Sequence, residues 1–370
     1  AVALSANAGS ILQAVPVEHR DDQLLQWWSR VALVSEDWKT LTDVIGQMSE
    51  ASRSDSRWRY WQSRALEATG QSVEAARIRE NLSREANYYG FLSADYLQKP
   101  YSICPLEPAV SGQAVTELRQ RADIARALEL RSAGIDNWAL SEWTLAVSRL
   151  DNDGLRAAAA LAVEEGLHDR VIFALGNSVD RQFYDWRCPV LCENEVIAAS
   201  GSLSLDAAWF LGVMRSDSAL AENARYSAGA LVLMQVTPDT ARRLARKHGI
   251  PYRSSAQLKQ GGLNIKLGTR FMRDLLEKYN QNPVLVSGAY NAGPEAVDRW
   301  LDTRPRGDST VWVESIPYYE TRDYIPRVLA FTTIYDWRLN NPVKRVSSRM
   351  PDLDSSTIKP VETTEVVCEA

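Results

Sequence analysis

An acidic residue at the end of a predicted helix is the first place where this sequence could do chemistry. Residues 206–219 have the pattern of an amphipathic helix, with Asp217 near its C-terminal end. The helix dipole disfavours a carboxylate there, so the side chain should hold its proton more easily. Such a group suits general acid catalysis, in which a leaving oxygen is protonated as its bond breaks. Taken alone, Asp217 would be a solvated charge at a helix end.

The segment after this helix contains a helix start preceded by two side chains that could face a cleft. Thr237 is the expected N-cap and Pro238 the first helical residue. Met234 and Gln235 lie just before this start, where side chains can line a groove. A core methionine and a capping glutamine would explain the pair equally well.

A third group of residues lies at a predicted helix end further along the chain. Tyr290 and Asn291 precede Ala292, Gly293 and Pro294, and Gly followed by Pro is a C-terminal helix signal. A buried tyrosine at this point needs a partner for its hydroxyl. Beyond it, Glu314 alone would be interpreted as a charge in a loop.

Taken together, four blocks between residues 205 and 337 resemble the catalytic domain of soluble lytic transglycosylases in order and in spacing. That family has R-Q-E-S at the first block and G-A-x-G-L-M-Q-x-M-P at the second. The blocks in this chain are Arg215-Ser-Asp217-Ser218-Ala219, Gly229-Ala-Leu-Val-Leu233-Met234-Gln235-Val-Thr-Pro238, Ala289-Tyr290-Asn291-Ala292-Gly293-Pro294 and Val313-Glu314-Ser-Ile-Pro317-Tyr-Tyr-Glu320-Thr321-Arg322-Asp-Tyr324-Ile.

The resemblance extends upstream and implies an all-α fold. The Trp58 and Tyr88 regions resemble the last part of the family's α-superhelical domain, and the longer helical ring expected ahead of them is missing, as in a truncated or shortened member. We therefore expect an α-superhelical solenoid of helical hairpins followed by a lysozyme-like (goose-type) α domain. The expected division is the end of the α-superhelical domain (1–100), a helical linker domain (101–195), the lysozyme-like transglycosylase domain (196–340) and an extended tail (341–370).

The resemblance also implies an activity and a set of site residues. The family cleaves the β-1,4 bond between N-acetylmuramic acid and N-acetylglucosamine in peptidoglycan without water, leaving a 1,6-anhydromuramoyl end. Asp217 would be acid and then base, with no second carboxylate required, because the N-acetyl group and the 6-hydroxyl of the substrate take part. The residues expected to bind substrate are Met234, Gln235, Tyr290, Asn291, Glu314 and Tyr319. Tyr318 and Tyr324 could add stacking surface for sugars, although helix packing explains them equally well.

Two departures from the family pattern keep a second function open. Asp217 stands where the family has Glu, which withdraws the carboxyl group by about 1.5 Å, the length of one C–C bond. A misplacement of about 1 Å can lower a rate on the order of a hundredfold. Val232 replaces a glycine beside the groove, where glycine permits positive φ or close approach. The alternative is a catalytically inactive peptidoglycan-binding or scaffold protein that holds another cell-wall enzyme.

The first half of the chain predicts stacked helices. From about residue 20 to 180 it consists of helical segments of about 12 to 18 residues separated by short Gly, Asp or Ser breaks, as in solenoids of helix pairs. We expect Trp58, Trp61, Trp138 and Trp143 to lie in the core. Dense prolines between residues 98 and 115 predict a loop.

Composition limits the classes of partner. A net charge of −5 provides no basic field for phosphate backbones, so a nucleic-acid partner is not expected. Peptidoglycan glycan strands, with cell-wall enzymes as further partners, fit better. No apolar run approaches the 18 residues of a membrane span.

The four cysteines indicate neither a disulfide scaffold nor a zinc site, and no metal or cofactor is implied. Cys188 and Cys192 flank Pro189 closely enough for a local disulfide, and two thiols are the alternative. The first residue, Ala1, is not preceded by Met or a leader, as in a mature exported protein or an excised fragment. With the family resemblance, the expected compartment is the periplasm.

Overall fold

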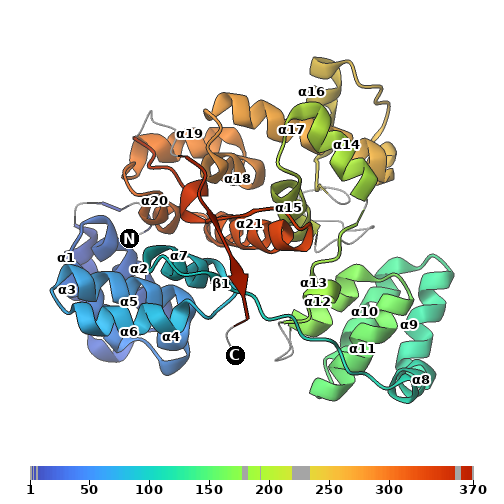
Figure 1. Cartoon of the computed structure of the whole chain (residues 1–370), viewed down its shortest axis with the longest axis horizontal. Helices are drawn as coiled ribbons and strands as arrows, with labels where there is room; N and C mark the ends of the chain where they lie inside the picture. The colour runs from blue at the N-terminus through green and yellow to red at the C-terminus, as the bar shows by residue number, and fades with distance from the viewer. Residues whose placement is uncertain are drawn as a thin grey trace. The chain divides into compact units, whose positions relative to one another are not determined.

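The computed structural model shows a chain built almost entirely of helices, which confirms the all-α prediction (Figure 1). It falls into two compact units. Unit 1 comprises residues 1–103, 200–216 and 269–370, and unit 2 comprises 104–199 and 217–268. The structure describes all residues except 1, 3, 6, 177–181, 192, 219–233, 355–359, 369 and 370, and the side chains of 195 and 218.

The N-terminal part of unit 1 is a series of short helices, most of which begin at a polar cap. Asp21, Asp37, Asp55 and Asn87 each accept a hydrogen bond from a backbone N–H of the first turn, which satisfies a donor that the helix itself leaves unpaired. Consecutive helices pack as hairpins, α2 on α3 and α5 on α6. The elements are α1 (Ala8–Gln13), η1 (Val17–His19), α2 (Asp22–Val34), α3 (Trp38–Gln47), α4 (Glu50–Ser54), α5 (Ser56–Ala68), α6 (Ser72–Leu82) and α7 (Tyr88–Tyr96).

Unit 2 continues the hairpin pattern with α9 packed on α10 and α11 on α12. Its core is rich in small and aliphatic side chains, including Ala158, Leu161 and Val171, all fully buried. Small residues at these positions let the helix pairs approach closely. The elements are α8 (Gly112–Gln120), α9 (Ala122–Ser132), α10 (Asp136–Val147), α11 (Asn152–Glu164), α12 (His168–Gly176), α13 (Tyr184–Arg187), α14 (Glu193–Leu203), α16 (Pro238–His248) and η2 (Ser255–Lys259).

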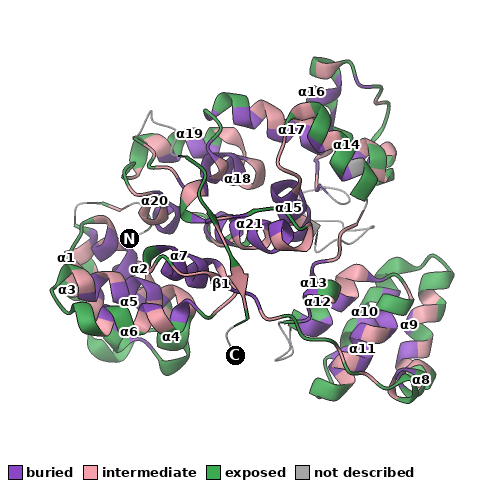
Figure 2. Ribbon diagram, viewed as in Figure 1, coloured by how far each residue is buried: buried purple, intermediate pink, exposed green. Residues whose placement is uncertain are grey.

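The second part of unit 1 contains the long helix α21, which is buried over more than half of its length and packs against α7 and α18 (Figure 2). The division between the units falls within α14 after Ala199, within α15 after Ser216 and within α17 after Gly268. The helices of this part are α15 (Ala207–Ser218), α17 (Gly261–Lys278), α18 (Pro283–Ala292), α19 (Pro294–Thr303), α20 (Ser309–Ser315) and α21 (Tyr319–Arg338).

The described residues after 341 form short paired strands, whereas the sequence predicted an extended or frayed tail. β2 (Val343–Lys344) pairs antiparallel with β3 (Thr363–Thr364), and β4 (Val366–Val367) pairs parallel with β1 (Tyr101–Ser102). The short helix η3 (Ser347–Arg349) follows β2. Strand β1 lies within the proline-rich segment for which the sequence predicted a loop.

Two sequence predictions about the helices were wrong in detail. The described helices between residues 20 and 180 are at most 13 residues long, and glycines in left-handed conformation (Gly70, Gly134 and Gly166) closely follow the ends of three of them. Trp138 is 67% exposed, whereas Trp58, Trp61 and Trp143 are buried as expected. Trp138 and Trp143 are five residues apart on α10, so at 3.6 residues per turn both cannot face the core.

The cysteines differ from the prediction. Cys104 and Cys368 are both disulfide-bonded, and each directly or closely follows one of the paired strands β1 and β4. The spacing of these two cysteines along the chain contains no signal that either is disulfide-bonded. Cys188 is buried and retains its thiol, so of the two alternatives for this residue the thiol is the one found. Cys192 lies outside the described residues.

No helix among the described residues is long and apolar enough to span a membrane.

Candidate functional site

Asp217 lies one residue before the end of α15, so the predicted position at a helix C-terminus is confirmed. The prediction of an amphipathic helix is wrong, because residues 208–215 are buried all round. At Gly212, a Cβ atom would approach Thr332 Oγ1 within 2.7 Å and the carbonyl of Val328 within 2.9 Å. The helix therefore lies directly against the backbone of α21, and Asp217, at the partly exposed end, is the first acidic side chain after this contact.

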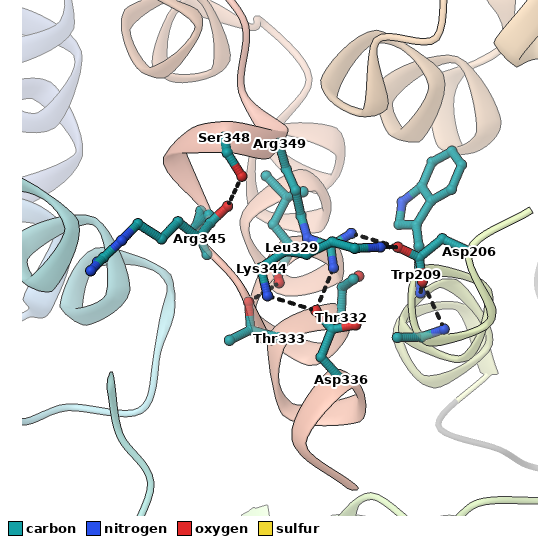
Figure 3. Close-up of polar contacts among 12 residues, drawn as sticks. Asp206, Trp209, Leu329, Thr332, Thr333, Asp336, Lys344, Arg345, Ser348 and Arg349 are labelled. Carbon is teal, nitrogen blue, oxygen red and sulfur yellow. Dashed lines mark hydrogen bonds and ion pairs between the residues drawn. The ribbon is translucent and has the colours of Figure 1, made fainter. Parts of the chain in front are cut away.

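The other end of α15 is fixed by a partly buried ionic cluster (Figure 3). Asp206 Oδ1 accepts a hydrogen bond from the backbone N–H of Ala208 (3.0 Å). Its Oδ2 accepts from Lys344 Nζ (2.6 Å) and Arg349 Nη1 (3.0 Å), and Arg349 also pairs with Asp336 at 2.5 Å. Burial alone would raise the pKa of Asp206, but the charges of Arg349 and Lys344 outweigh it and lower that pKa to about 2. The C-terminal segment thus anchors the start of the helix that ends at Asp217.

Met234 and Gln235, in unit 2, are held by α17. The backbone N–H of Met234 donates to Asn264 Oδ1 (2.8 Å), and a Cβ at Gly268 would lie 2.7 Å from the Met234 side chain, which is fully buried. Gln235 has φ +44°, a left-handed conformation that is uncommon for a residue other than glycine. The predicted helix start follows it, with Thr237 as N-cap and proline at the first position. Met234 therefore fills a core position, and Gln235 is the partly exposed member of the pair.

Tyr290 and Asn291 form the end of α18, and Gly293 follows with φ +87°, as the sequence predicted. Asn291 Nδ2 donates to Glu320 Oε1 (3.1 Å), and Thr321 Oγ1 donates to Asn291 Oδ1 (2.6 Å). Two of the four sequence blocks therefore meet through this amide. Tyr290 is half-buried, and its ring packs against that of Phe271 with centroids 5.2 Å apart.

Glu314 is a buried ion-pair centre that connects α20 with three N-terminal helices. Its Oε1 accepts from Arg30 Nε (2.9 Å), and its Oε2 accepts from Trp61 Nε1 and Tyr89 OH (3.3 Å each). Arg57 Nε lies 3.6 Å from Oε2 and donates to the Tyr89 hydroxyl (2.8 Å). Burial would raise the pKa of Glu314, but Arg57 and Arg30 outweigh it and lower that pKa. Glu314 is 2% exposed, and both of its carboxylate oxygens accept hydrogen bonds from protein side chains. In this structure it therefore positions other residues of the protein.

Tyrosines of the fourth block separate into two surface residues and one core residue. Tyr318 and Tyr319 are 49% and 69% exposed, whereas Tyr324 is 1% exposed and belongs to the core. Arg322 donates to the carbonyl of Ile316 (2.8 Å) and lies over the Tyr319 ring at 5.7 Å. Arg322, in the first turn of α21, therefore fixes the loop that carries the two exposed aromatic rings, Tyr318 and Tyr319.

The seven predicted site residues fall in both units. Asp217, Met234 and Gln235 belong to unit 2, and Tyr290, Asn291, Glu314 and Tyr319 belong to unit 1. Sequence reasoning missed the groups that hold them, since these come from distant segments. Asn264, a polar residue between Leu263 and Ile265, was the available signal. Val232 lies outside the described residues. The supporting residues are Arg30, Arg57, Tyr89, Asn264, Gly268, Glu320, Thr321 and Arg349.

Three family models match consecutive parts of this helical chain. The Soluble lytic murein transglycosylase L domain matches residues 117–179. The Transglycosylase SLT domain matches residues 195–313, and the Soluble lytic transglycosylase helical domain matches residues 315–343. Fold and motif order thus define a helical protein with a lysozyme-like SLT domain.

Known proteins agree with this class. The soluble lytic murein transglycosylase of Salmonella typhimurium is 28% identical over 327 residues, covering 85% of this chain and 50% of that protein. An inactive mutant of lytic transglycosylase Slt from Pseudomonas aeruginosa superposes with a TM-score of 0.86 at 32% identity, covering 93% of this chain and 56% of that one. For the 70 kDa soluble lytic transglycosylase of Escherichia coli the TM-score is 0.77 at 26% identity, with coverages of 93% and 55%.

This chain belongs to the soluble lytic transglycosylase family, as the four sequence blocks predicted. It spans about half the length of the curated relatives that it matches.

Proposed function

We propose that this chain is a peptidoglycan lytic transglycosylase, which cleaves the β-1,4 bond between N-acetylmuramic acid and N-acetylglucosamine and forms 1,6-anhydro-N-acetylmuramic acid. The observation that carries the proposal is the position of Asp217. The helix is buried along its length and anchored at its start by the Asp206 cluster, while Asp217 sits at its partly exposed end within the SLT match. Positioned acids of this kind are what glycosidic cleavage requires.

The reaction balances with Asp217 as the only protein acid–base group. The carboxyl group gives its proton to the glycosidic oxygen, the bond from that oxygen to C1 of the muramoyl residue breaks, and N-acetylglucosamine leaves with the new hydroxyl. The N-acetyl oxygen of the substrate stabilises the positive charge that develops at C1. The 6-hydroxyl oxygen then bonds to C1, and its proton returns to Asp217. Water takes no part.

Substrate binding in this proposal uses the exposed aromatic and amide groups. Tyr319 offers an exposed ring for the apolar face of a sugar, and Asn291, fixed from two sides, offers a pre-oriented amide. Gln235 lies in a strained conformation, a feature that clusters at functional sites. Met234 and Glu314 are fully buried, so we assign each a supporting role within its own unit, unit 2 for Met234 and unit 1 for Glu314.

We further propose that the protein works in the periplasm. Disulfides persist in oxidising compartments and are rare in the cytosol, and Cys104 and Cys368 are disulfide-bonded. The polymer named in the relatives, murein, is consistent with this location.

Digestion of purified sacculi in ¹⁸O-labelled water tests the activity. The native chain should release muropeptides with 1,6-anhydro ends and without label, as measured by mass spectrometry. Labelled reducing ends would indicate a hydrolase. If sacculi are pelleted with the protein but release no muropeptide, the chain is a binding or scaffold protein, and the transglycosylase proposal fails.

A further inference from the structure

One face of α16 carries four basic side chains that the proposed reaction does not use. Arg242, Arg243, Arg246 and Lys247 are all exposed, and their spacing places them along one side of the helix. The ion pair of Arg242 with Asp239 (2.6 Å) is itself solvent-exposed, so it is weak and can exchange partners.

This face is fixed toward solvent by the rest of the helix. Ala241 and Leu244 are fully buried and Ala245 nearly so, which holds the opposite face against the protein. The Thr237 side chain caps the start of the helix, and Gly249, with φ +63°, ends it. The helix cannot rotate its basic side inward without exposing these apolar groups.

The positive charge of α16 is greater than helix stability requires. Residues 238–268 contain seven Lys or Arg and one acidic residue, Asp239, in a chain whose net charge is −5. Basic residues in the last turn favour the helix dipole, which accounts for Arg246 and Lys247. Arg242 and Arg243 lie before that turn, so the dipole does not account for them.

The basic residues, with Asp239, line an open hollow of about 520 Å³. Helix α16 begins at Pro238, three residues after Gln235, to which the proposed function assigns substrate binding. Peptidoglycan strands carry short peptides with free carboxylates on their muramic acid residues, and Arg recognises carboxylates well. We propose that the basic face of α16 binds the carboxylates of these stem peptides, an inference that rests on the proposed function.

A pelleting assay with purified sacculi tests the inference. The binding variant is Arg242→Gln/Arg246→Gln/Lys247→Gln in the full chain. The matched control, Arg53→Gln/Arg77→Gln/Arg84→Gln, removes three exposed positive charges from the N-terminal helices and leaves the same net charge. Binding at low temperature is compared for intact sacculi, for sacculi stripped of peptides by an amidase, and for sacculi whose carboxylates are converted to amides.

The binding variant should lose affinity for intact sacculi about tenfold, since three exposed charge contacts each contribute a few-fold, and the control should not. The native chain should weaken to the same extent on stripped or amidated sacculi and in 0.5 M salt, where screening is strong. Equal binding by the native chain and the binding variant overturns the inference. The inference is also overturned if the binding variant still binds more weakly than the native chain on amidated sacculi. A preference of the native chain for anionic lipid vesicles over sacculi overturns it as well. Release of anhydro-muropeptides is measured separately, so failure of this inference leaves the proposed activity in place.

Discussion

Replacing Glu314 with Gln should strongly destabilise the protein, because it removes a buried charge and leaves its partners in place. Arg30 is 1% exposed and its ion pair in the structure is with Glu314, whereas Arg57 also pairs with Asp323. Removing one member of a buried pair costs about 3–5 kcal/mol. That is a large part of a typical unfolding free energy of about 5–15 kcal/mol.

Unfolding in urea, followed by tryptophan fluorescence, measures this loss. Trp61, one of the twelve tryptophans of the chain, donates to Glu314 and therefore lies in the cluster that the substitution changes. The matched control is Glu74→Gln, whose pair with Arg77 is solvent-exposed and should contribute little to stability. A double variant, Arg30→Met/Glu314→Leu, removes both charges and should regain most of the stability.

The reasoning fails if Glu314→Gln costs no more than Glu74→Gln. It fails equally if the double variant is less stable than Glu314→Gln, since the cost would then come from lost packing. The positioning role is tested by activity under native conditions: Glu314→Gln should lower the rate on sacculi because the Ser315–Tyr319 turn loosens, and the double variant should restore it.

Two further expectations concern the anchoring of α15. The charge of Asp206 contributes about 2 kcal/mol to stability, which is fully present above its unfolded pKa near 4 and is lost as the pH falls toward 2. Asp206→Asn should therefore flatten the curve of stability against pH in that window. An unchanged slope would refute the role of Arg349. Gly212→Ala should destabilise by about 1–3 kcal/mol and lower activity, because its Cβ would lie 2.7 Å from Thr332 Oγ1. In contrast, Gly201→Ala should be neutral or stabilising, because Gly201 is an exposed helical residue with open space around it. Equal effects of Gly212→Ala and Gly201→Ala on the thermal midpoint would contradict the packing argument.

Local signals predicted local structure correctly. Thr237 and Pro238 begin a helix and Gly293 ends one as expected, because caps depend on a few neighbouring residues. The order of the four blocks predicted the family. Trp138 shows where such reasoning stops, since composition alone does not say which face of a helix its neighbours cover.

The supporting interactions could not be predicted because they join distant segments. Arg30 and Glu314 are 284 residues apart, and Arg345 reaches Asp95 across 250. From the sequence Glu314 was a loop charge with a role taken from the family, and the fold makes it the centre of an ionic cluster. The positive charge of α16 was also not predicted, because the net charge of −5 is a sum over the whole chain and does not show a local basic segment.

The role of Asp217 is the central claim, and comparing three side chains at this position tests it most directly. Release of 1,6-anhydro-muropeptides from sacculi is measured for the native chain, Asp217→Asn and Asp217→Glu, with binding to sacculi measured in parallel. Asp217→Asn should bind sacculi as the native chain does and release no product, because the amide keeps the shape and lacks the proton. Asp217→Glu should release product faster than the native chain, because it extends the carboxyl group by one methylene. Product release by Asp217→Asn at the native rate, or none from either the native chain or Asp217→Glu, would contradict the account.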